Sequence, residues 1–330
     1  MDKIITLDYG SGGKKTSELI DNIIVKSFDN PPLSALGDGA ILGDLAFSTD
    51  SFVVSPLFFP GGDIGELAVF GTVNDLSMCG AEAKYLSCGL ILEEGLETET
   101  LEKVISSMKA AADRAGVRIV TGDTKVVEKG RGDGLYINTA GIGTLKYPHL
   151  GKNRICPGDK VIVSGTVGDH GTAVMLARSG MMKGSLKSDC ACLKSLALRL
   201  LADCGDSVRI LRDPTRGGLA TTLNEFTEGS QISVELEEAA IPVRDDVGMA
   251  CSILGLDPLY CANEGKMICI VSPEAAEAAL QSLRAEETGE HAEIIGTVTT
   301  NYPGKVVIHT RAGGSRILQK LAGAQLPRIC

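Results

Sequence analysis

The chain has 330 residues, of which 44% are hydrophobic and 22% charged, a composition that excludes a disordered protein and predicts about two folded domains. Its 32 basic and 42 acidic residues give a net charge of −10, and it contains no Trp, so binding to nucleic acid or to an anionic membrane is not expected. No apolar run approaches the ~18 residues that a membrane helix needs, and the N-terminus is acidic where a signal peptide would be apolar. We therefore expect a cytoplasmic protein.

The first part of the chain alternates helical and strand-like patterns. Residues 98–115 give the clearest helix, because apolar side chains recur on one face and Gly116 follows as a stop signal. A second helix is predicted over residues 16–28. Strands are predicted over residues 49–54, 85–92, 117–120 and 135–145.

Residues 146–159 resemble a junction, since they contain two prolines, two glycines and several charges. The alternation then resumes, with helices expected near 171–180, 193–203, 217–228, 245–254 and 274–286, and strands at 160–164, 231–236, 267–271, 293–298 and 305–310. We therefore predict an α/β (α+β) protein with domains at 1–150 and 151–310. The glycine-bearing segment 311–330 is expected to be a mobile tail.

The first motif is the glycine loop Gly10-Ser11-Gly12-Gly13-Lys14-Lys15-Thr16, which precedes a predicted helix. Backbone N–H groups at a helix start can bind phosphate. The loop is not a Walker A motif, because Asp8 stands where that motif has its first glycine and Lys15 where it has Ser or Thr. Taken alone, the loop is better explained as a plain turn with a helix cap.

Five aspartates stand at the ends of apolar runs or beside glycine: Asp38, Asp50, Asp75, Asp123 and Asp213. Any one of them alone is adequately explained as a turn or helix cap. Together they allow another interpretation, in which hard oxygen ligands hold Mg²⁺ and so let an acidic protein bind ATP.

Ten cysteines are present, and in a cytoplasmic protein we expect thiols. Only Cys190 and Cys192 are close in sequence, no C-x-x-C pair occurs, and a structural zinc site is weakly supported. Cys330 differs from the other nine because it is the last residue of the chain. A terminal thiol on a glycine-bearing tail can be presented to more than one active site, although it can also be an accidental exposed thiol.

These motifs occur in a characteristic order. The glycine loop is followed by Gly-Asp-Gly-Ala at 37–40, Gly-Asp-Thr-Lys at 122–125 and Gly-Asp-His-Gly at 168–171. Arg-Asp-Pro-Thr-Arg-Gly-Gly at 212–218, Ala-Asn-Glu-Gly-Lys at 262–266 and the terminal Pro-Arg-Ile-Cys complete the series. Over residues 10–330 the chain resembles the HypE family. These carbamoyl dehydratases help to build the cyanide ligands of [NiFe] hydrogenases, and they belong to the aminoimidazole ribonucleotide synthetase superfamily.

The resemblance implies a two-lobed fold whose N-terminal lobes pair into a dimeric β-barrel, with ATP held between the lobes. It implies that Cys330 carries a thiocarbamate, which a HypF-type carbamoyltransferase supplies and which ATP-dependent dehydration converts to a thiocyanate. A HypC–HypD scaffold complex would then receive the cyanide group.

The resemblance also implies roles for single residues. Gly10, Gly12 and Gly13 would lie over the ATP phosphates, and the five aspartates would contact Mg²⁺ or the nucleotide, with Asp38, Asp50, Asp75 and Asp213 as the candidate metal ligands. Lys125 and Glu264 would lie near the modified thiol. Either of these two residues can be the proton acceptor, and the sequence does not choose between them.

Two other functions are compatible with parts of the sequence. Another ATP-dependent synthetase or kinase of the same superfamily explains the aspartates but leaves the terminal Cys330 without a role. A non-enzymatic thiol adaptor or metallochaperone that uses Cys190, Cys192 and Cys330 explains the thiols but leaves the five aspartates unused.

Overall fold

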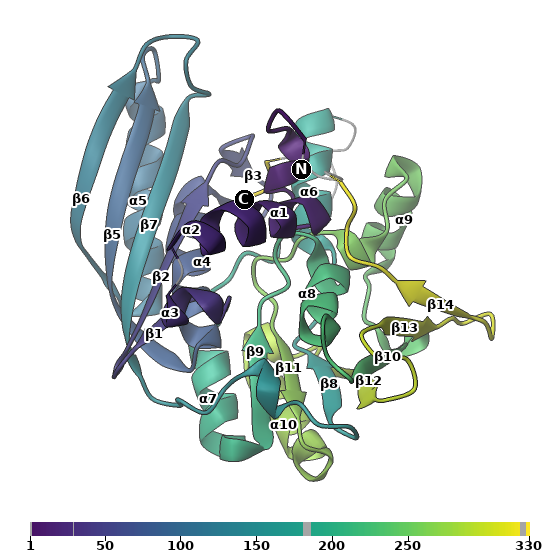
Figure 1. The fold of residues 1–330 in the computed structure, drawn as a ribbon. Helices are drawn as coiled ribbons and strands as arrows, with labels where there is room; N and C mark the ends of the chain where they lie inside the picture. The colour runs from purple at the N-terminus through teal and green to yellow at the C-terminus, as the bar shows by residue number, and fades with distance from the viewer. Residues whose placement is uncertain (1, 29, 181–185, 324–327) are drawn as a thin grey trace.

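Two separate main β-sheets divide the chain into an N-terminal and a C-terminal lobe (Figure 1). The computed structural model describes residues 2–28, 30–180, 186–323 and 328–330. Within these ranges, no helix has the length and apolar character needed to cross a membrane.

The N-terminal lobe is built on a five-stranded sheet with the order β1-β2-β7-β5-β6. Only the pair β5–β6 is parallel, and β6 forms one edge of the sheet. The strands are β1 (Ala40–Leu42), β2 (Leu45–Phe52), β5 (Ala81–Glu93), β6 (Arg118–Val127) and β7 (Leu135–Leu145); a separate small pair comprises β3 (Phe58–Phe59) and β4 (Gly62–Asp63).

Two helices, α4 (Ile64–Met78) and α5 (Thr98–Ala115), accompany this sheet, and α4 packs against β2, β5 and β7. Helix α5 ends at Gly116 with φ +61°, which confirms the predicted helix and its stop signal. The predicted helix at 16–28 is also confirmed in outline. It forms as consecutive turns that follow η1 (Leu7–Gly10): α1 (Lys14–Leu19), η2 (Ile20–Val25) and α2 (Lys26–Phe28), with α3 (Pro31–Ser34) after them.

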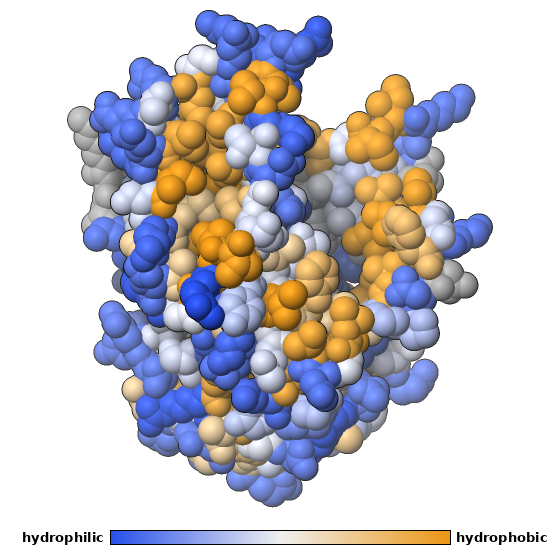
Figure 2. All heavy atoms as spheres, turned by 90° about the vertical axis from the view of Figure 1, so that its left-hand side faces the viewer, coloured by the Kyte–Doolittle hydropathy of each residue, from blue (hydrophilic) through white to orange (hydrophobic). Residues whose placement is uncertain are grey.

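The N-terminal sheet carries several exposed apolar side chains. Val120 and Val126 of β6 are 59% and 67% exposed, and Tyr85, Ile91 and Ile142 on β5 and β7 are exposed as well. Figure 2, which looks at the side of the molecule where this sheet lies, shows groups of apolar residues between charged ones.

The C-terminal lobe contains a seven-stranded mixed sheet with the order β14-β13-β10-β12-β8-β11-β9. Helix α8 (Gly218–Thr227) contributes to the core on one face, and α7 (Lys194–Cys204) and α10 (Ala276–Arg284) to the core on the other. The strands are β8 (Lys160–Val163), β9 (Val208–Arg212), β10 (Ser233–Glu237), β11 (Ile268–Val271), β12 (Glu293–Thr299), β13 (Val306–His309) and β14 (Ser315–Leu318).

One apolar cluster spans the two lobes. Buried residues of α4 and the N-terminal sheet join those of α6 (Asp169–Ser179) and α9 (Asp245–Leu254) in a single cluster. The cluster also contains Ile329 and Cys330 from the end of the chain. Because the last residues pack between elements from both lobes, the chain end lies in the middle of the molecule (Figure 1).

The segment 311–330, which the sequence predicts to be a mobile tail, is held at several places in the structure. Its residues Ser315–Leu318 form β14, which pairs with β13 and extends the C-terminal sheet beyond the predicted domain boundary at 310. Its last two residues, Ile329 and Cys330, are 4% and 5% exposed. Residues 324–327 of the predicted tail lie outside the described residues.

Candidate active site

Three of the five predicted aspartates converge between the lobes. Asp38 precedes β1, Asp75 lies on α4, and Asp213 directly follows β9. Each offers one carboxylate oxygen, and these three oxygens lie within 4.8 Å of one another. The chain thus brings together carboxylates that are 37 and 138 residues apart in sequence (75 − 38 and 213 − 75).

The environment of these carboxylates favours a bound cation. Burial raises the pKa of Asp75 and Asp213 well above the ordinary value, and the neighbouring negative charges raise it further. Burial also raises the pKa of Asp38, against the lowering effect of its ion pair with Arg212. Hard carboxylate oxygens that repel one another are a donor set that fits Mg²⁺.

Asp50, the fourth predicted metal ligand, lies on β2 outside this group of three. Its Oδ1 accepts a hydrogen bond from the Ser51 amide at 2.7 Å. Its charge still acts on the site, because it raises the pKa of both Asp75 and Glu264. Asp50 therefore belongs to the same acidic cleft, while its role as a direct ligand stays a prediction.

The terminal thiol lies in this cleft beside an arginine. The Arg216 Nε–H group donates to Cys330 Sγ at 2.8 Å, and Arg216 Nη1 lies 3.4 Å from the carbonyl oxygen of Gly10. Burial raises the pKa of Cys330 to about 12, although Arg216 opposes this and favours the thiolate. Glu264 and Asp50 raise the same pKa, which indicates that their charges are close to the sulfur.

Glu264 is a buried carboxyl group with unused bonding capacity. Its residue is 4% exposed, and no described group hydrogen-bonds to its Oε1. Burial raises the pKa of Glu264 well above the ordinary value, and the negative charges of Asp213, Asp50 and Asp189 raise it further. Such a carboxylate, once ionised, binds a proton strongly and has an oxygen available to accept one.

Two asparagines fix the loops that carry these groups. Asn74, next to Asp75, bonds through its side chain to the Ala191 carbonyl at 3.0 Å and to the Leu193 amide at 2.8 Å, so it ties α4 to the C-terminal lobe. Asn263, next to Glu264, accepts from the Gly168 amide at 2.7 Å and donates to the Pro214 carbonyl at 3.1 Å.

The glycine loop packs against the site through its small residues. Gly12 has φ +74°, and a Cβ there would lie 2.7 Å from Cβ of Arg216. A Cβ on Gly13 would lie 2.3 Å from the carbonyl oxygen of Leu321, which accepts from the Lys14 amide. The glycines therefore allow Arg216 and the chain leading to the terminus to approach closely. Binding of phosphate by Gly10, Gly12 and Gly13 stays a prediction.

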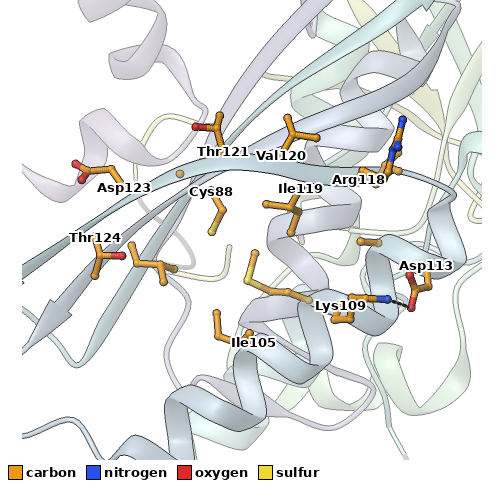
Figure 3. A pocket seen from close by; sticks show the side chains of 15 residues that line it. Cys88, Ile105, Lys109, Asp113, Arg118, Ile119, Val120, Thr121, Asp123 and Thr124 are labelled. Carbon is orange, nitrogen blue, oxygen red and sulfur yellow. Dashed lines mark hydrogen bonds and ion pairs between the residues drawn. The ribbon is translucent and has the colours of Figure 1, made fainter.

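Asp123 and Lys125 are not brought to this cleft within one chain. Both lie on the edge strand β6, their side chains are 69% and 67% exposed, and they form an ion pair with each other. A groove of about 920 Å³ runs between this strand and α5. Figure 3 shows Cys88 and Ile119 directed into the groove from the sheet and Ile105 from the helix.

Comparison with known proteins gives the family. The models described as AIR synthase related protein, N-terminal and C-terminal domain, match residues 37–145 and 156–309. The carbamoyl dehydratase HypE of Azotobacter vinelandii is 47% identical, over 99% of this chain and 97% of that protein. This chain belongs to the HypE family of carbamoyl dehydratases, which act in hydrogenase maturation.

Solved structures of HypE proteins agree with the fold. A HypE in complex with ATP is 51% identical with a TM-score of 0.84, covering 99% of this chain and 100% of that one. A HypE from a HypE–HypF complex is 46% identical with a TM-score of 0.88, covering 92% and 99%. The predicted fold class is thus confirmed as a mixed α/β, two-domain fold of the AIR synthase type.

Arg216 is the site residue that sequence reasoning left without a role. It stands in the Arg-Asp-Pro-Thr-Arg-Gly-Gly motif, and a cation three residues after the predicted metal ligand Asp213 was a usable signal. His170 and Asn74 were also unassigned, although His170 stands in the Gly-Asp-His-Gly motif. His170 contacts Ile329 and Asn74 contacts Leu193, both far away in sequence. The local sequence does not predict such contacts.

Proposed function

We propose that this chain converts a thiocarbamate on its own Cys330 into a thiocyanate, at the expense of ATP, and so makes the cyanide donor for [NiFe] hydrogenase assembly. The observation that supports this most directly is the position of the terminal thiol. Cys330 Sγ accepts from Arg216 inside the acidic cleft, next to the charge of Glu264. A thiol that is only an exposed accident of the sequence would have no reason to be buried there.

The nucleotide site that we propose is the cleft between the lobes. A related HypE has been solved with ATP, which supports ATP as the substrate of this chain. Asp38, Asp75 and Asp213 would hold Mg²⁺, with Asp50 as the further candidate. The ion would neutralise negative charge on the phosphates when bound.

The chemistry removes one water from a primary amide. The carbonyl oxygen of Cys330-S-CO-NH₂ attacks the γ-phosphorus of ATP, the bond to the β-phosphate oxygen breaks, and ADP leaves. One proton leaves the nitrogen, which gives the phosphorylated imidate. Loss of the second N–H proton then forms the C≡N bond as phosphate departs with the former carbonyl oxygen. The carbonyl oxygen of the amide is a poor leaving group, and phosphorylation turns it into part of a good one, phosphate.

Glu264 is the proton acceptor that we favour. Its Oε1 has no hydrogen-bond partner among the described residues, and burial gives the ionised form a high proton affinity. Arg216 would stabilise negative charge that develops on the thiocarbamate oxygen or sulfur, because its guanidinium already contacts the sulfur. Lys125 enters this scheme only if a second protomer supplies it.

We propose a homodimer formed through the N-terminal sheets. Strand β6 is an edge strand whose first nine residues are exposed, and an exposed apolar edge is a natural pairing site. A second copy seated there would cover Val120 and Val126 and close the sheets into the barrel that the family resemblance implies. The same contact would carry Asp123 and Lys125 toward the cleft of the partner.

Two partners complete the proposal. A related HypE forms a complex with HypF, which supports a HypF-type carbamoyltransferase as the source of the carbamoyl group. A HypC–HypD complex as the recipient of the cyanide group is a prediction from the family resemblance alone. All ten cysteines are free thiols, in keeping with the reducing cytoplasm in which we place the reaction.

The test is intact-protein mass spectrometry with Cys330→Ala as the control. Incubation with the carbamoyltransferase, carbamoyl phosphate and ATP should add one carbamoyl group to Cys330. ATP should then remove one water, and a non-hydrolysable ATP analogue should not. An unmodified Cys330 would instead favour a small-molecule ATP-dependent synthetase or kinase of the same superfamily.

The thiol adaptor or metallochaperone is less well supported. Within the described residues, the grouping of three or more metal-binding side chains consists of Asp38, Asp75 and Asp213 and includes no thiol. Cys330 is paired with Arg216 rather than with Cys190 or Cys192.

A further inference from the structure

The end of the chain is bound through its backbone. The Val53 amide donates to the carbonyl oxygen of Cys330 at 2.9 Å, and the Ser55 amide donates to that of Arg328 at 3.3 Å. The Arg178 guanidinium also donates to the Arg328 carbonyl at 2.6 Å. The segment that follows β2 therefore pairs with the last residues as a short added strand does.

The carbonyl between these two is bound by a histidine. Nε2 of His170 lies 2.6 Å from the carbonyl oxygen of Ile329. A carbonyl can only accept, so Nε2 carries the proton. Nδ1 lies 2.8 Å from Ser188 Oγ, and in neutral histidine this nitrogen accepts from the hydroxyl. Burial lowers the pKa of His170, which favours the neutral ring.

Ser188 is itself held in place. Its Oγ accepts from the Cys190 amide at 3.0 Å, which leaves the hydroxyl proton for His170. The ring of His170 is 0% exposed and packs edge-to-face on Phe59, with ring centroids 5.4 Å apart. The contacts with Ser188 and Phe59 that fix the tautomer and direction of this donor do not involve the chain end.

The thiol has two requirements that conflict. At 5% exposure, Cys330 has no access to the active site of a separate carbamoyltransferase, whereas dehydration needs it beside Arg216 and Glu264. The chain end must therefore leave and return, and the contacts that hold its last three residues decide how often it is docked. Of these contacts, the bond from His170 is made by a fully buried side chain that serves the dehydration chemistry in no other way described above.

We propose that His170, oriented by Ser188, is a positioning residue that holds the chain end in the cleft and sets the docked fraction of Cys330. The inference rests on the proposed function in one respect, namely that the docked state is the one in which the group on Cys330 is dehydrated. The docking equilibrium itself requires neither ATP nor a partner protein.

The test compares His170→Phe with His170→Gln. Phe keeps a planar ring against Phe59 but donates no hydrogen bond, and Gln retains an N–H group with a reach close to that of Nε2. Iodoacetamide labelling of Cys330 is measured by mass spectrometry. A protease that cleaves only after lysine cuts at Lys320 and releases residues 321–330 as one peptide. Loss of one hydrogen bond should speed labelling in His170→Phe roughly three- to tenfold, and His170→Gln should return toward the wild-type rate. Cys156, which is exposed, should react equally in all three proteins.

A second measurement separates positioning from general damage. With the carbamoyltransferase present, His170→Phe should be carbamoylated faster and, once carbamoylated, dehydrated more slowly, whereas a damaged fold slows both steps. The proposal is overturned if Cys330 of His170→Phe is labelled at the wild-type rate. It is also overturned if His170→Gln is labelled as fast as His170→Phe. Should His170→Phe fail to fold, Ser188→Ala takes its place. We expect the labelling rate of Cys330 to increase roughly twofold in this variant. An unchanged labelling rate would count against the proposal.

Discussion

The acidic cleft and strand β6 carry similar motifs in opposite surroundings. In the cleft, Asp213 is buried, Asp75 is half-buried, and both have raised pKa values among carboxylates that come from both lobes. On β6, Asp123 and Lys125 are mainly exposed and pair with each other. Asp38 and Asp123 both follow a glycine in the sequence, yet only Asp38 joins a site within one chain.

Residues of the cleft are brought into a site by a single chain. Residues on β6 would join a site only when a second chain binds. A carboxylate is costly to bury, so the buried group must be compensated by a cation or ligand. An exposed ion pair contributes little to stability and is easily rearranged when a partner approaches. The two regions therefore predict different responses to substitution.

The largest effect is expected in the cleft. Glu264→Gln keeps the size of the side chain but removes its ability to accept a proton. We expect dehydration of the thiocarbamate to slow by about 100- to 10,000-fold, the usual contribution of a general base. Single-turnover mass spectrometry of carbamoylated protein measures this rate. Carbamoylation of Cys330 serves as the control and should be unaffected; normal thiocyanate formation would reject the role of Glu264.

The next effect concerns the exposed strand. Val120→Glu puts a charge on the apolar edge that we expect a second copy to cover. The dissociation constant of the dimer should rise roughly 30-fold, which corresponds to about 2 kcal/mol. Analytical ultracentrifugation measures it. Ile253→Glu on α9, where the side chain is 73% exposed, is the matched control and should leave association unchanged. Identical behaviour of the two variants would argue against β6 as the interface.

A mixed dimer connects the two regions. Lys125→Ala and Cys330→Ala proteins should each be inactive if both residues are required. In a hybrid of the two, one cleft combines an intact Cys330 with an intact Lys125 from the other protomer. Random mixing of a twofold dimer should therefore restore about one quarter of wild-type dehydration. Mixtures that stay inactive would show that Lys125 is not supplied across the interface.

The smallest effect is on stability. Raised carboxylate pKa values mean that the folded protein binds more protons than the unfolded chain, so this stabilisation is present at low pH and is lost as pH rises through the folded-state values. The ligand-free protein should thus become less stable as the pH rises above the ordinary pKa range of a carboxyl group. Asp75→Asn should flatten this slope and raise the melting temperature at pH 8 by roughly 2 °C or more.

Thermal unfolding at several pH values measures this last prediction. Asp123→Asn is the control, because its carboxylate is exposed and has a lowered pKa from its bond to Lys125. If Asp75→Asn left the pH slope as steep as in the wild type, the buried cluster would not be its source.

Amphipathic elements were predictable from the sequence, whereas elements buried on all sides were not. Helix α5 has a clear apolar face and was predicted to the residue. Helix α4 has 13 buried residues out of 15, so no polar face reveals its period, and it was not assigned from the pattern. Strand β14 was missed because its apolar residues are few and its neighbour β13 supplies the pairing.

The site was predictable where motifs carry chemistry and hidden where tertiary contacts decide. The resemblance pointed to Cys330, Glu264 and the aspartates, and the structure brings Asp38, Asp75 and Asp213 together. The docked chain end was not expected, because glycines at 313, 314 and 323 are typical of a flexible segment. Much of the docking uses backbone carbonyl groups, and these are the same in every sequence.

The carbonyl of the final residue is hydrogen-bonded to Val53, and its side chain is the reacting group. Residue 330 therefore contributes its backbone and its reacting side chain to one closed cleft at the same time. An affinity tag fused after Cys330 would have to fit in this cleft beside Val53 and Arg216, and we expect it to hold the thiol outside. A recombinant protein tagged before residue 1 avoids this conflict.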